Sequence, residues 1–447
     1  MKTKTWLARA PARLPGHGCS GAGPVRRASR LCSRRLGGPR PQAGAAPRRG
    51  RADFAGRQSG ATPAKAWLVA AVFAGALPLA GQQARQYRQG GEQVRELAGS
   101  IALTAPVRLV VEAQWGTIEL RGQSGAAVGY RLVARMPAGP AAAAALARWP
   151  VQIERRGDEV VIATGAPDGG VERGELRLVL AVPRLVQRLR AETAVGNIRA
   201  DGLAMPLVVA TRAGNIRAGR VTGLLEASSR SGDIVVEHGG AVEARTSGSI
   251  RIGQADGPVV LATSGGEVRV GRAGGRVRIT SEGGGIDIGQ AAGPVVAYSD
   301  GGNIRLGAAV ERAELHTGGG NIVVQSAHSI QCATRSGDIR LLQLLDGVEA
   351  QTGSGQIEAV FAPQARLAAS ELVAQHGNIQ VRLPATVGAE VWAEIRSPEG
   401  HQIRSDYPAL QAVGGGWGMV QARARLNGGG PALRLLSVGS DITVQHR

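Results

Sequence analysis

The feature that most constrains the fold is a short repeat that recurs through the second half of the chain. Each copy has a head consisting of Gly, a polar or small residue, and then Ile or Val. The heads begin at Gly196, Gly214, Gly232, Gly248, Gly266, Gly284, Gly302, Gly320, Gly337, Gly355 and Gly377. Seven of the ten intervals between heads are 18 residues. A fixed period of this kind indicates a repeat architecture rather than a single globular core.

Apolar residues alternate with other residues inside each repeat. The residue two positions after the head glycine is always Ile or Val, and the residue two further on is usually apolar, as in Ile286 and Ile288. A second alternation lies seven and five positions upstream of the head, as in Val259 and Leu261. Alternation of period two with branched side chains predicts β-strands that bury one face. Each repeat therefore contains two strands of about five residues.

The regularity of the repeat predicts how these strands pair. The connections are rich in glycine, as at Gly274 and Gly275, which favours short turns. Two strands in every 18 residues predict that each strand pairs with its own copy in the next repeat. The expected fold is all-β, a parallel β-solenoid (β-helix) with about 18 residues per coil and less regular caps at both ends. We expect a right-handed coil, although the sequence does not determine its hand.

The pattern divides the chain into five parts. They are a basic low-complexity extension (1–65), a signal peptide or membrane anchor (66–84), an N-terminal cap with early β-coils (85–195), the regular solenoid (196–382) and a C-terminal cap (383–447). In the N-terminal cap we expect strands at 107–111, 116–120, 151–153 and 160–162 and a short helix at 141–146. The C-terminal cap ends in another head-like strand at 439–444.

Charge and hydropathy separate the N-terminal parts from the rest. Residues 1–65 contain fifteen Lys or Arg and one acid, whereas the remaining chain contains 38 Arg and 33 acids. The net charge of +19 therefore does not make the whole protein a polycation. Lys65 precedes the uncharged apolar run 66–81, which small residues and Pro78 close, as in a secretory signal. An uncleaved anchor stays an alternative, and for residues 1–65 a long signal flank competes with a nucleic-acid-binding tail.

The head motif resembles that of a known bacterial family. Thr-x-x-Gly followed by Asn or Asp and Ile occurs at 193–198, 211–216 and 334–339, and 377–384 is similar to that family's closing segment. In these residues the chain resembles the putative-adhesin family of β-strand-repeat domains over residues 100–447. The resemblance implies a β-solenoid of the cell envelope, and it brings no catalytic residues.

One outward column of the repeat is a candidate binding site. The position three residues after the head glycine lies between two inward positions and should therefore face solvent. It holds six arginines, Arg199, Arg217, Arg251, Arg269, Arg305 and Arg340. Arginine binds carboxylate and phosphate groups with paired hydrogen bonds, so this column predicts binding of anionic envelope glycans or lipid head groups. The alternative is ordinary solvation of a charged face.

Other residue types give no catalytic, cofactor or metal site. The histidines after the apolar run fall in different columns, and the acids are scattered. A calcium-binding coil needs acidic ligands from adjacent turns, but only Asp287 stands at such a place. Cys332 occupies an inward apolar column and is expected to be buried. The Asn or Asp after many head glycines is expected to bond nearby backbone, with a ladder facing a ligand as the alternative.

These observations favour an exported, non-enzymatic β-solenoid of the bacterial cell envelope, acting as an adhesin or scaffold. The alternatives are a β-helix enzyme acting on polysaccharide and an anchored periplasmic sensing module. The expected partners are anionic glycans, lipid head groups or envelope proteins, and no nucleic acid is expected for the mature domain. The expected location is the periplasm or the cell surface, and the sequence leaves the oligomeric state open.

Overall fold

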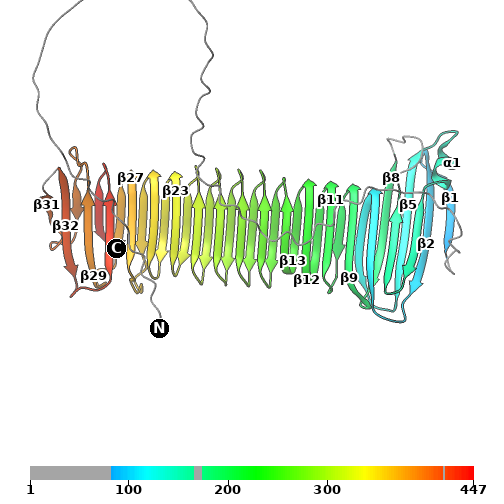
Figure 1. The fold of residues 1–447 in the computed structure, drawn as a ribbon, viewed down its shortest axis with the longest axis horizontal. Coiled ribbons are helices and arrows are strands. Elements are labelled where there is room, and N and C mark those ends of the chain that lie inside the picture. The colour runs from blue at the N-terminus through cyan, green and yellow to red at the C-terminus, as the bar shows by residue number, and fades with distance from the viewer. Residues whose placement is uncertain (1–81, 166–173, 416–417) are drawn as a thin grey trace, which may run out of the picture. The chain divides into compact units, whose positions relative to one another are not determined.

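The computed structural model describes residues 82–165, 174–415 and 418–447, all of which belong to one compact unit. The basic extension 1–65 and the apolar run 66–81 lie outside the described residues. The described strands form a row in which the chain advances coil by coil (Figure 1).

The regular part of the row is a parallel β-solenoid, as the sequence predicts. Each strand pairs in parallel with the strand two further along the chain. The pairing register is one repeat, because Val268 faces Ile286 and Ile286 faces Ile304. Each coil therefore contributes one strand to each of two faces, and hydrogen bonds join neighbouring coils.

One face, called here the head face, carries the strands that follow the head glycines. Its strands in the regular part are β14 (Ile250–Ala255), β16 (Val268–Ala273), β18 (Ile286–Ala291), β20 (Ile304–Ala309), β22 (Ile322–Ala327), β24 (Ile339–Leu344), β26 (Ile357–Phe361) and β28 (Ile379–Leu383).

The other face, called the second face, carries the strands that precede the heads. They are β15 (Val259–Thr263), β17 (Val277–Ser281), β19 (Val295–Ser299), β21 (Ala313–Thr317), β23 (Ile330–Ser336), β25 (Val348–Ser354) and β27 (Ser370–His376).

The earlier coils continue both faces. The second face holds β9 (Val186–Val195) and β11 (Leu207–Ala213), and the head face holds β10 (Ile198–Asp201). Two long strands, β12 (Ile216–Ser231) and β13 (Ile234–Thr246), run through both faces. The departures from the 18-residue interval lie in turns, at a loop between β26 and β27, and at register shifts between Val221 and Leu224 in β12 and between Leu341 and Leu344 in β24. Inward residues pair with inward residues on both sides of them.

The core is a set of buried columns between the two faces. Along each strand buried and outward residues alternate, as the period-two pattern predicts. Ile286 and Ile288 are at most 1% exposed, and Cys332 is buried between the register partners Leu315 and Ala350. Burial of each such aliphatic side chain stabilises the coil by about 1.5–3 kcal/mol.

The N-terminal end is closed by mixed strands. They are β1 (Gln83–Gln89), β2 (Glu92–Ala102), β3 (Val107–Trp115), β4 (Thr117–Gln123), β5 (Ala127–Pro137), β6 (Val151–Arg156), β7 (Glu159–Thr164) and β8 (Glu175–Pro183), with helix α1 (Ala142–Ala147). The strands and the short helix expected here are therefore confirmed. β3 and β4 form the first coil, and β5 to β8 are an excursion that covers its outer side.

The C-terminal end departs from a simple linear order. Its strands are β29 (Ala389–Ile395), β30 (Ile403–Ser405), β31 (Ala412–Gly415), β32 (Met419–Leu426), β33 (Ala432–Ser437) and β34 (Ile442–His446). The last two strands insert inside the row, because β34 pairs with both β28 and β30 and β33 with both β27 and β29. Figure 1 accordingly shows the C-terminus within the row rather than at its tip.

Antiparallel strands end the row on both sides. β1 pairs with β2 at the N-terminal end, and β31 pairs with β32 at the C-terminal end. The outer strand β1 is fully exposed and reads Gln-Ala-Arg-Gln-Tyr-Arg-Gln, so polar and charged side chains protect its free edge from pairing with other chains. No helix within the described parts of the chain is long and apolar enough to cross a bilayer. The hand of the coil stays a prediction.

Candidate functional site

The six predicted arginines lie in one register column of the head face, called here the arginine column. Arg199 faces Arg217 across β10 and β12, and Arg251 faces Arg269 across β14 and β16. Three other residues interrupt the arginines. Val235 stands between Arg217 and Arg251, Asp287 between Arg269 and Arg305, and Val323 between Arg305 and Arg340. All six arginines are exposed. Neighbouring positions of the column are about 4.8 Å apart, which is the spacing of paired strands.

Three of the six arginines lie close to a carboxylate of the protein, and three do not. Arg269 pairs with Glu267 at 2.9 Å, Arg340 lies 3.5 Å from Asp338, and Arg199 lies 3.6 Å from Glu119. The other three, Arg217, Arg251 and Arg305, make no ion pair or side-chain hydrogen bond with any residue that the structure describes. These three guanidinium groups keep all their donors for solvent or a ligand.

Glu119 lies at the N-terminal end of the arginine column, where it is the register partner of Arg199. The carboxylate is only 3% exposed, yet it accepts two hydrogen bonds from Arg177, at 3.0 and 2.9 Å, and one from Arg121 at 3.1 Å. Burial alone would raise the pKa of Glu119, but the guanidinium groups outweigh it and the pKa lies below its ordinary value. Arg199 thus belongs in part to a structural cluster.

The second face carries charges of both signs, and Arg190 and Arg278 share its outward column with glutamates. Its outward column, called here the acidic column, contains five glutamates, Glu226, Glu243, Glu314, Glu349 and Glu371. Glu226 directly faces Glu243, and Glu349 directly faces Glu371. The glutamates of the acidic column make it less favourable for an anionic polymer than the arginine column, where six of the nine positions from Arg199 to Arg340 are arginines.

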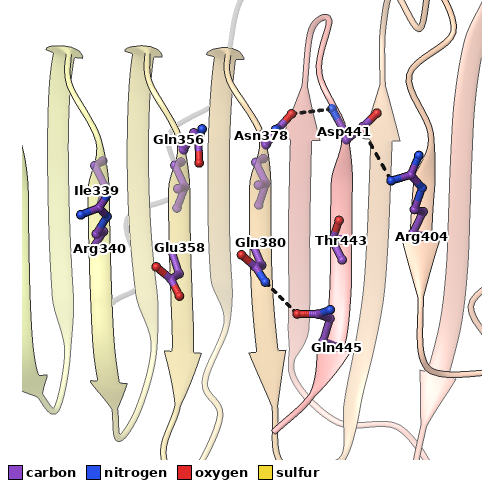
Figure 2. Close-up of a pocket in the computed structure, with 12 residues that line it drawn as sticks. Ile339, Arg340, Gln356, Glu358, Asn378, Gln380, Arg404, Asp441, Thr443 and Gln445 are labelled. Atoms are coloured by element: carbon purple, nitrogen blue, oxygen red, sulfur yellow. Dashed lines mark hydrogen bonds and ion pairs between the residues drawn. The ribbon is translucent and has the colours of Figure 1, made fainter.

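A groove of about 480 Å³ lies at the C-terminal end of the arginine column, across β24, β26, β28, β34 and β30. Figure 2 shows its polar side chains on neighbouring strands, with their ends on the outer side of the sheet. The column positions within it are Arg340, Glu358, Gln380, Thr443 and Arg404, in that order along the register. Five consecutive outward positions of one column thus form its floor.

Some side chains of the groove are paired with other side chains of the protein, and others have no partner among the described residues. Gln380 donates to Gln445 at 2.7 Å, and Glu358 lies 3.4 Å from Arg382. Arg404 lies 3.9 Å from Asp441. Among the described residues, the side chains of Gln356 and Thr443 have no hydrogen-bond partner.

The Asn and Asp side chains after the head glycines bond backbone, as expected, but in the neighbouring coil. Oδ1 of Asn303 accepts the backbone N–H of Asn321, and Oδ1 of Asn321 accepts that of Asp338, both at 2.8 Å. In the groove, Asn378 accepts the N–H of Asp441 and Asp441 that of Gln402, at 3.1 and 2.9 Å. The column joins coils, and its Oδ1 atoms are occupied by protein.

The histidines of the described residues lie at separate places in the fold. His238 pairs with Asp256, His401 with Asp441, and His316 stacks on Tyr298 with ring centroids 5.0 Å apart. The part of the chain that the structure covers contains no group of three or more His, Cys, Asp or Glu that could hold a metal ion. Burial raises the pKa of the Cys332 thiol, which therefore stays protonated, as its inward column predicts.

The chain was compared with family models, curated proteins and solved structures. No family model and no curated protein matches the chain. Solved structures that match include a putative cell adhesion protein from Clostridium sporogenes, with 6% identity and a TM-score of 0.18, covering 79% of this chain and 100% of that one. They also include a putative adhesin from Parabacteroides merdae, with 11% identity and a TM-score of 0.21, covering 80% and 97%.

A third matching structure is a putative lipid binding protein from Parabacteroides distasonis, with 13% identity and a TM-score of 0.20, covering 80% of this chain and 97% of that one. Superpositions with such TM-scores carry no argument about the site or the function of this chain.

Sequence reasoning found the arginine column but missed the groove and the Glu119 cluster. Arg404 and Thr443 lie outside the regular repeat, and they join the column only because β34 and β30 pair beside β28. The alternating residues of the head-like strand at 439–444 were the one signal for Thr443. Glu119 had a signal, because it stands three residues after Gly116 in the head-like sequence Gly116-Thr117-Ile118, which lies before the periodic series. Nothing in the repeat marks Arg404.

Proposed function

We propose that this chain is an exported, non-enzymatic, adhesin-like or scaffold protein of a bacterial cell envelope that binds an anionic polymer along its arginine column. The observation that carries the proposal is the register of the column. Arg199 and Arg217, and Arg251 and Arg269, are directly opposed like charges on paired strands. Like charges in this position destabilise a sheet, and a bound anion offsets that cost.

The unoccupied guanidinium groups support the same proposal. Arg217, Arg251 and Arg305 are exposed and unpaired within the described residues, so they bind an anion without breaking an existing ion pair. Their positions follow a straight strand ladder, which suits an extended polymer better than a compact ligand. The glutamates of the acidic column make that column less favourable for such a polymer than the arginine column.

An enzyme acting on polysaccharide is the alternative from another class. The groove does bring two carboxylates, Glu358 and Asp441, onto one face. A glycosidase needs one carboxyl with a raised pKa as its general acid. The hydrogen bond from the backbone of Gln402, together with His401 and Arg404, instead lowers the pKa of Asp441 despite its partial burial. This favours a structural role for Asp441 and a binding role for the groove.

The test of the column is retention on immobilised polygalacturonate in a salt gradient. The variant with Arg217→Glu, Arg251→Glu and Arg305→Glu is compared with a control in which the off-column, exposed Arg230, Arg245 and Arg335 are replaced by Glu. Both variants have the same net charge. We expect the column variant to elute at clearly lower salt than the control. Equal losses in the two variants would show a nonspecific charge effect and would contradict the proposal.

Export and location are tested by treating intact cells with protease. Release of peptides from 196–380 would support a surface location and an adhesin. Cleavage only after permeabilisation of the outer layer would support the periplasm and a scaffold or sensing role. Digestion only after cell lysis would contradict export.

A further inference from the structure

We infer that the groove at the C-terminal end of the arginine column is a binding site for a carboxylated saccharide segment. This inference deepens the proposed function, since it rests on an anionic polymer lying along the head face and names its chemical class. The residues that carry it share only Arg340 with the six arginines of the column, and the repeat does not contain them as a unit. They are Arg340, Gln356, Glu358, Gln380, Arg404 and Thr443.

The size of the groove suits several linked rings. Its volume of about 480 Å³ lies within the range of about 300–1,000 Å³ that is usual for ligand sites. Arg340 and Arg404 stand four strand spacings apart in the register, which is about 19 Å. A ligand that reaches both arginines is therefore an extended chain and not a single small ion.

The side chains between the two arginines match hydroxyl groups. Carboxamides such as Gln356 and Gln380 both donate and accept hydrogen bonds, and so does the hydroxyl of Thr443, while Glu358 accepts only. A sugar ring presents hydroxyls that also donate and accept. Gln356 and Thr443 have no partner among the described residues, and Gln380 uses a single hydrogen of its amide toward Gln445.

The charges in the groove select sparse carboxylates over dense polyanions. The two arginines are balanced by Glu358 and Asp441 within the same groove. A chain with phosphate or sulfate groups at every position would place some of them against these carboxylates, which costs free energy. A carboxylated polysaccharide places its anions at the arginines and its hydroxyls at the carboxylates and amides.

The strands that carry the groove are held in place before any ligand arrives. Its side chains project from paired strands, and the Asn378 and Asp441 side chains are held by backbone N–H groups of neighbouring strands. Figure 2 marks the hydrogen bond that the Asp441 N–H donates to Asn378 and the one that Gln380 donates to Gln445. A preformed site loses little conformational freedom on binding.

The experiment is calorimetric titration of the full-length protein with three probes: tetragalacturonate, its carboxyl-reduced neutral counterpart, and inorganic tripolyphosphate. We expect tetragalacturonate to bind and the two other probes to bind at least about tenfold more weakly, which corresponds to about 1.4 kcal/mol. The variants Arg340→Ala with Arg404→Ala, and Gln356→Ala with Gln380→Ala, should each weaken tetragalacturonate binding by about tenfold or more. The control Arg230→Ala with Arg245→Ala, at exposed positions outside the arginine column and the groove, should leave it unchanged.

Each other outcome overturns the inference. No binding of tetragalacturonate, or binding that the groove variants leave unchanged while their melting temperatures match the wild type, would remove the groove as its site. Equal binding of the neutral saccharide or of tripolyphosphate would refute the assigned ligand class. Polymer retention that depends on Arg217, Arg251 and Arg305 would survive such a result, so failure of the groove and failure of the proposed function are distinguishable.

Discussion

At the scale of single residues, buried hydroxyl groups bind the coils to one another. Three positions before most head glycines a Thr or Ser is buried, and in most coils its hydroxyl donates to the carbonyl of the head glycine in the coil before, whereas Ser281 donates to Gly284 of its own coil. Thr263 donates to Gly248 at 2.7 Å, and Thr352 donates to Gly337 at 2.9 Å. The carbonyl lies in a turn where no strand partner reaches it, so the hydroxyl satisfies a polar atom that burial would otherwise leave without a bond.

Thr317→Val tests this column. Thr317 donates to Gly302 at 2.8 Å and accepts the N–H of Gly320 at 3.2 Å. Valine keeps the shape but removes both bonds, so we expect the free energy of unfolding in urea to fall by about 1–2 kcal/mol. Thr280→Val, at an exposed outward position of the same face, is the control and should change it by less than about 0.5 kcal/mol. Equal effects of the two substitutions would contradict the assignment.

Glu119→Gln tests the buried carboxylate at the end of the arginine column. Because the pKa of Glu119 is lower in the folded chain than in the unfolded chain, its ionised form stabilises the fold at pH values above the unfolded value of about 4.3. That contribution is lost as the pH falls through the folded pKa. We expect the variant to lose about 2 kcal/mol at pH 7 and to show a weaker decline in stability below about pH 4 than the wild type.

The measurement for Glu119→Gln is urea unfolding at a series of pH values. Glu267→Gln is the control, since Glu267 pairs with Arg269 at a half-exposed position where an ion pair contributes little. Parallel pH profiles for the wild type and Glu119→Gln would show that the cluster does not carry the acid sensitivity.

At the scale of elements, the head glycines are required by close packing of backbone on backbone. A Cβ at Gly302 would lie 2.3 Å from the carbonyl oxygen of Gly284 in the preceding coil, and one at Gly320 would lie 2.2 Å from that of Gly302. The head glycines at 302 and 320 have no left-handed φ, so turn conformation alone does not explain them. Stacked turns without side chains let the strands that follow them pair at the normal spacing.

Gly302→Ala should therefore separate the turns at one step of the stack. We expect a loss of about 1–3 kcal/mol in the free energy of unfolding, because a rigid backbone carbonyl has to move. Gly301→Ala is a closely matched control: it adds the same methyl group one residue earlier, where nothing lies within 4 Å of the new Cβ. Denaturant unfolding of the two variants checks this, and similar losses in both would contradict the packing explanation.

At the scale of the described unit, the stack is a series of coils that contact mainly their neighbours. Such a stack should tolerate the loss of one complete coil but not of half a coil. Deletion of residues 267–284 joins Gly266 to Gly285 and preserves both faces, the buried columns and the heads on either side. We expect this variant to keep a cooperative thermal transition and a strand-type circular dichroism spectrum.

Deletion of residues 267–275 is the control for that experiment. It removes a head-face strand and leaves two second-face strands in succession, so the buried columns no longer align. We expect loss of the cooperative transition. A stable fold after the half-coil deletion, or loss of folding after the full-coil deletion, would show that the coils are not independent units.

The period of the chain determined a large part of this structure. The spacing of the head glycines fixed the length of a coil, and the alternation in Ile286 and Ile288 fixed which side chains are buried. The same spacing placed Arg199 to Arg340 in one outward column, because every coil repeats the same local geometry. Local patterns suffice wherever a residue contacts only its own copy one coil away.

The caps and the complete site were decided by contacts between segments distant in sequence. β34 returns over a separation of 63 residues to lie beside β28, and this step brings Thr443 and Arg404 next to Gln380 and completes the groove. Glu119 meets Arg177 and Arg199 by a similar excursion at the other end. A strand that inserts into a row shows the same apolar alternation as any other strand, so its sequence does not reveal its partner. The partner depends on which pairing buries the apolar face and completes the hydrogen bonds of the sheet, and no local pattern contains that information.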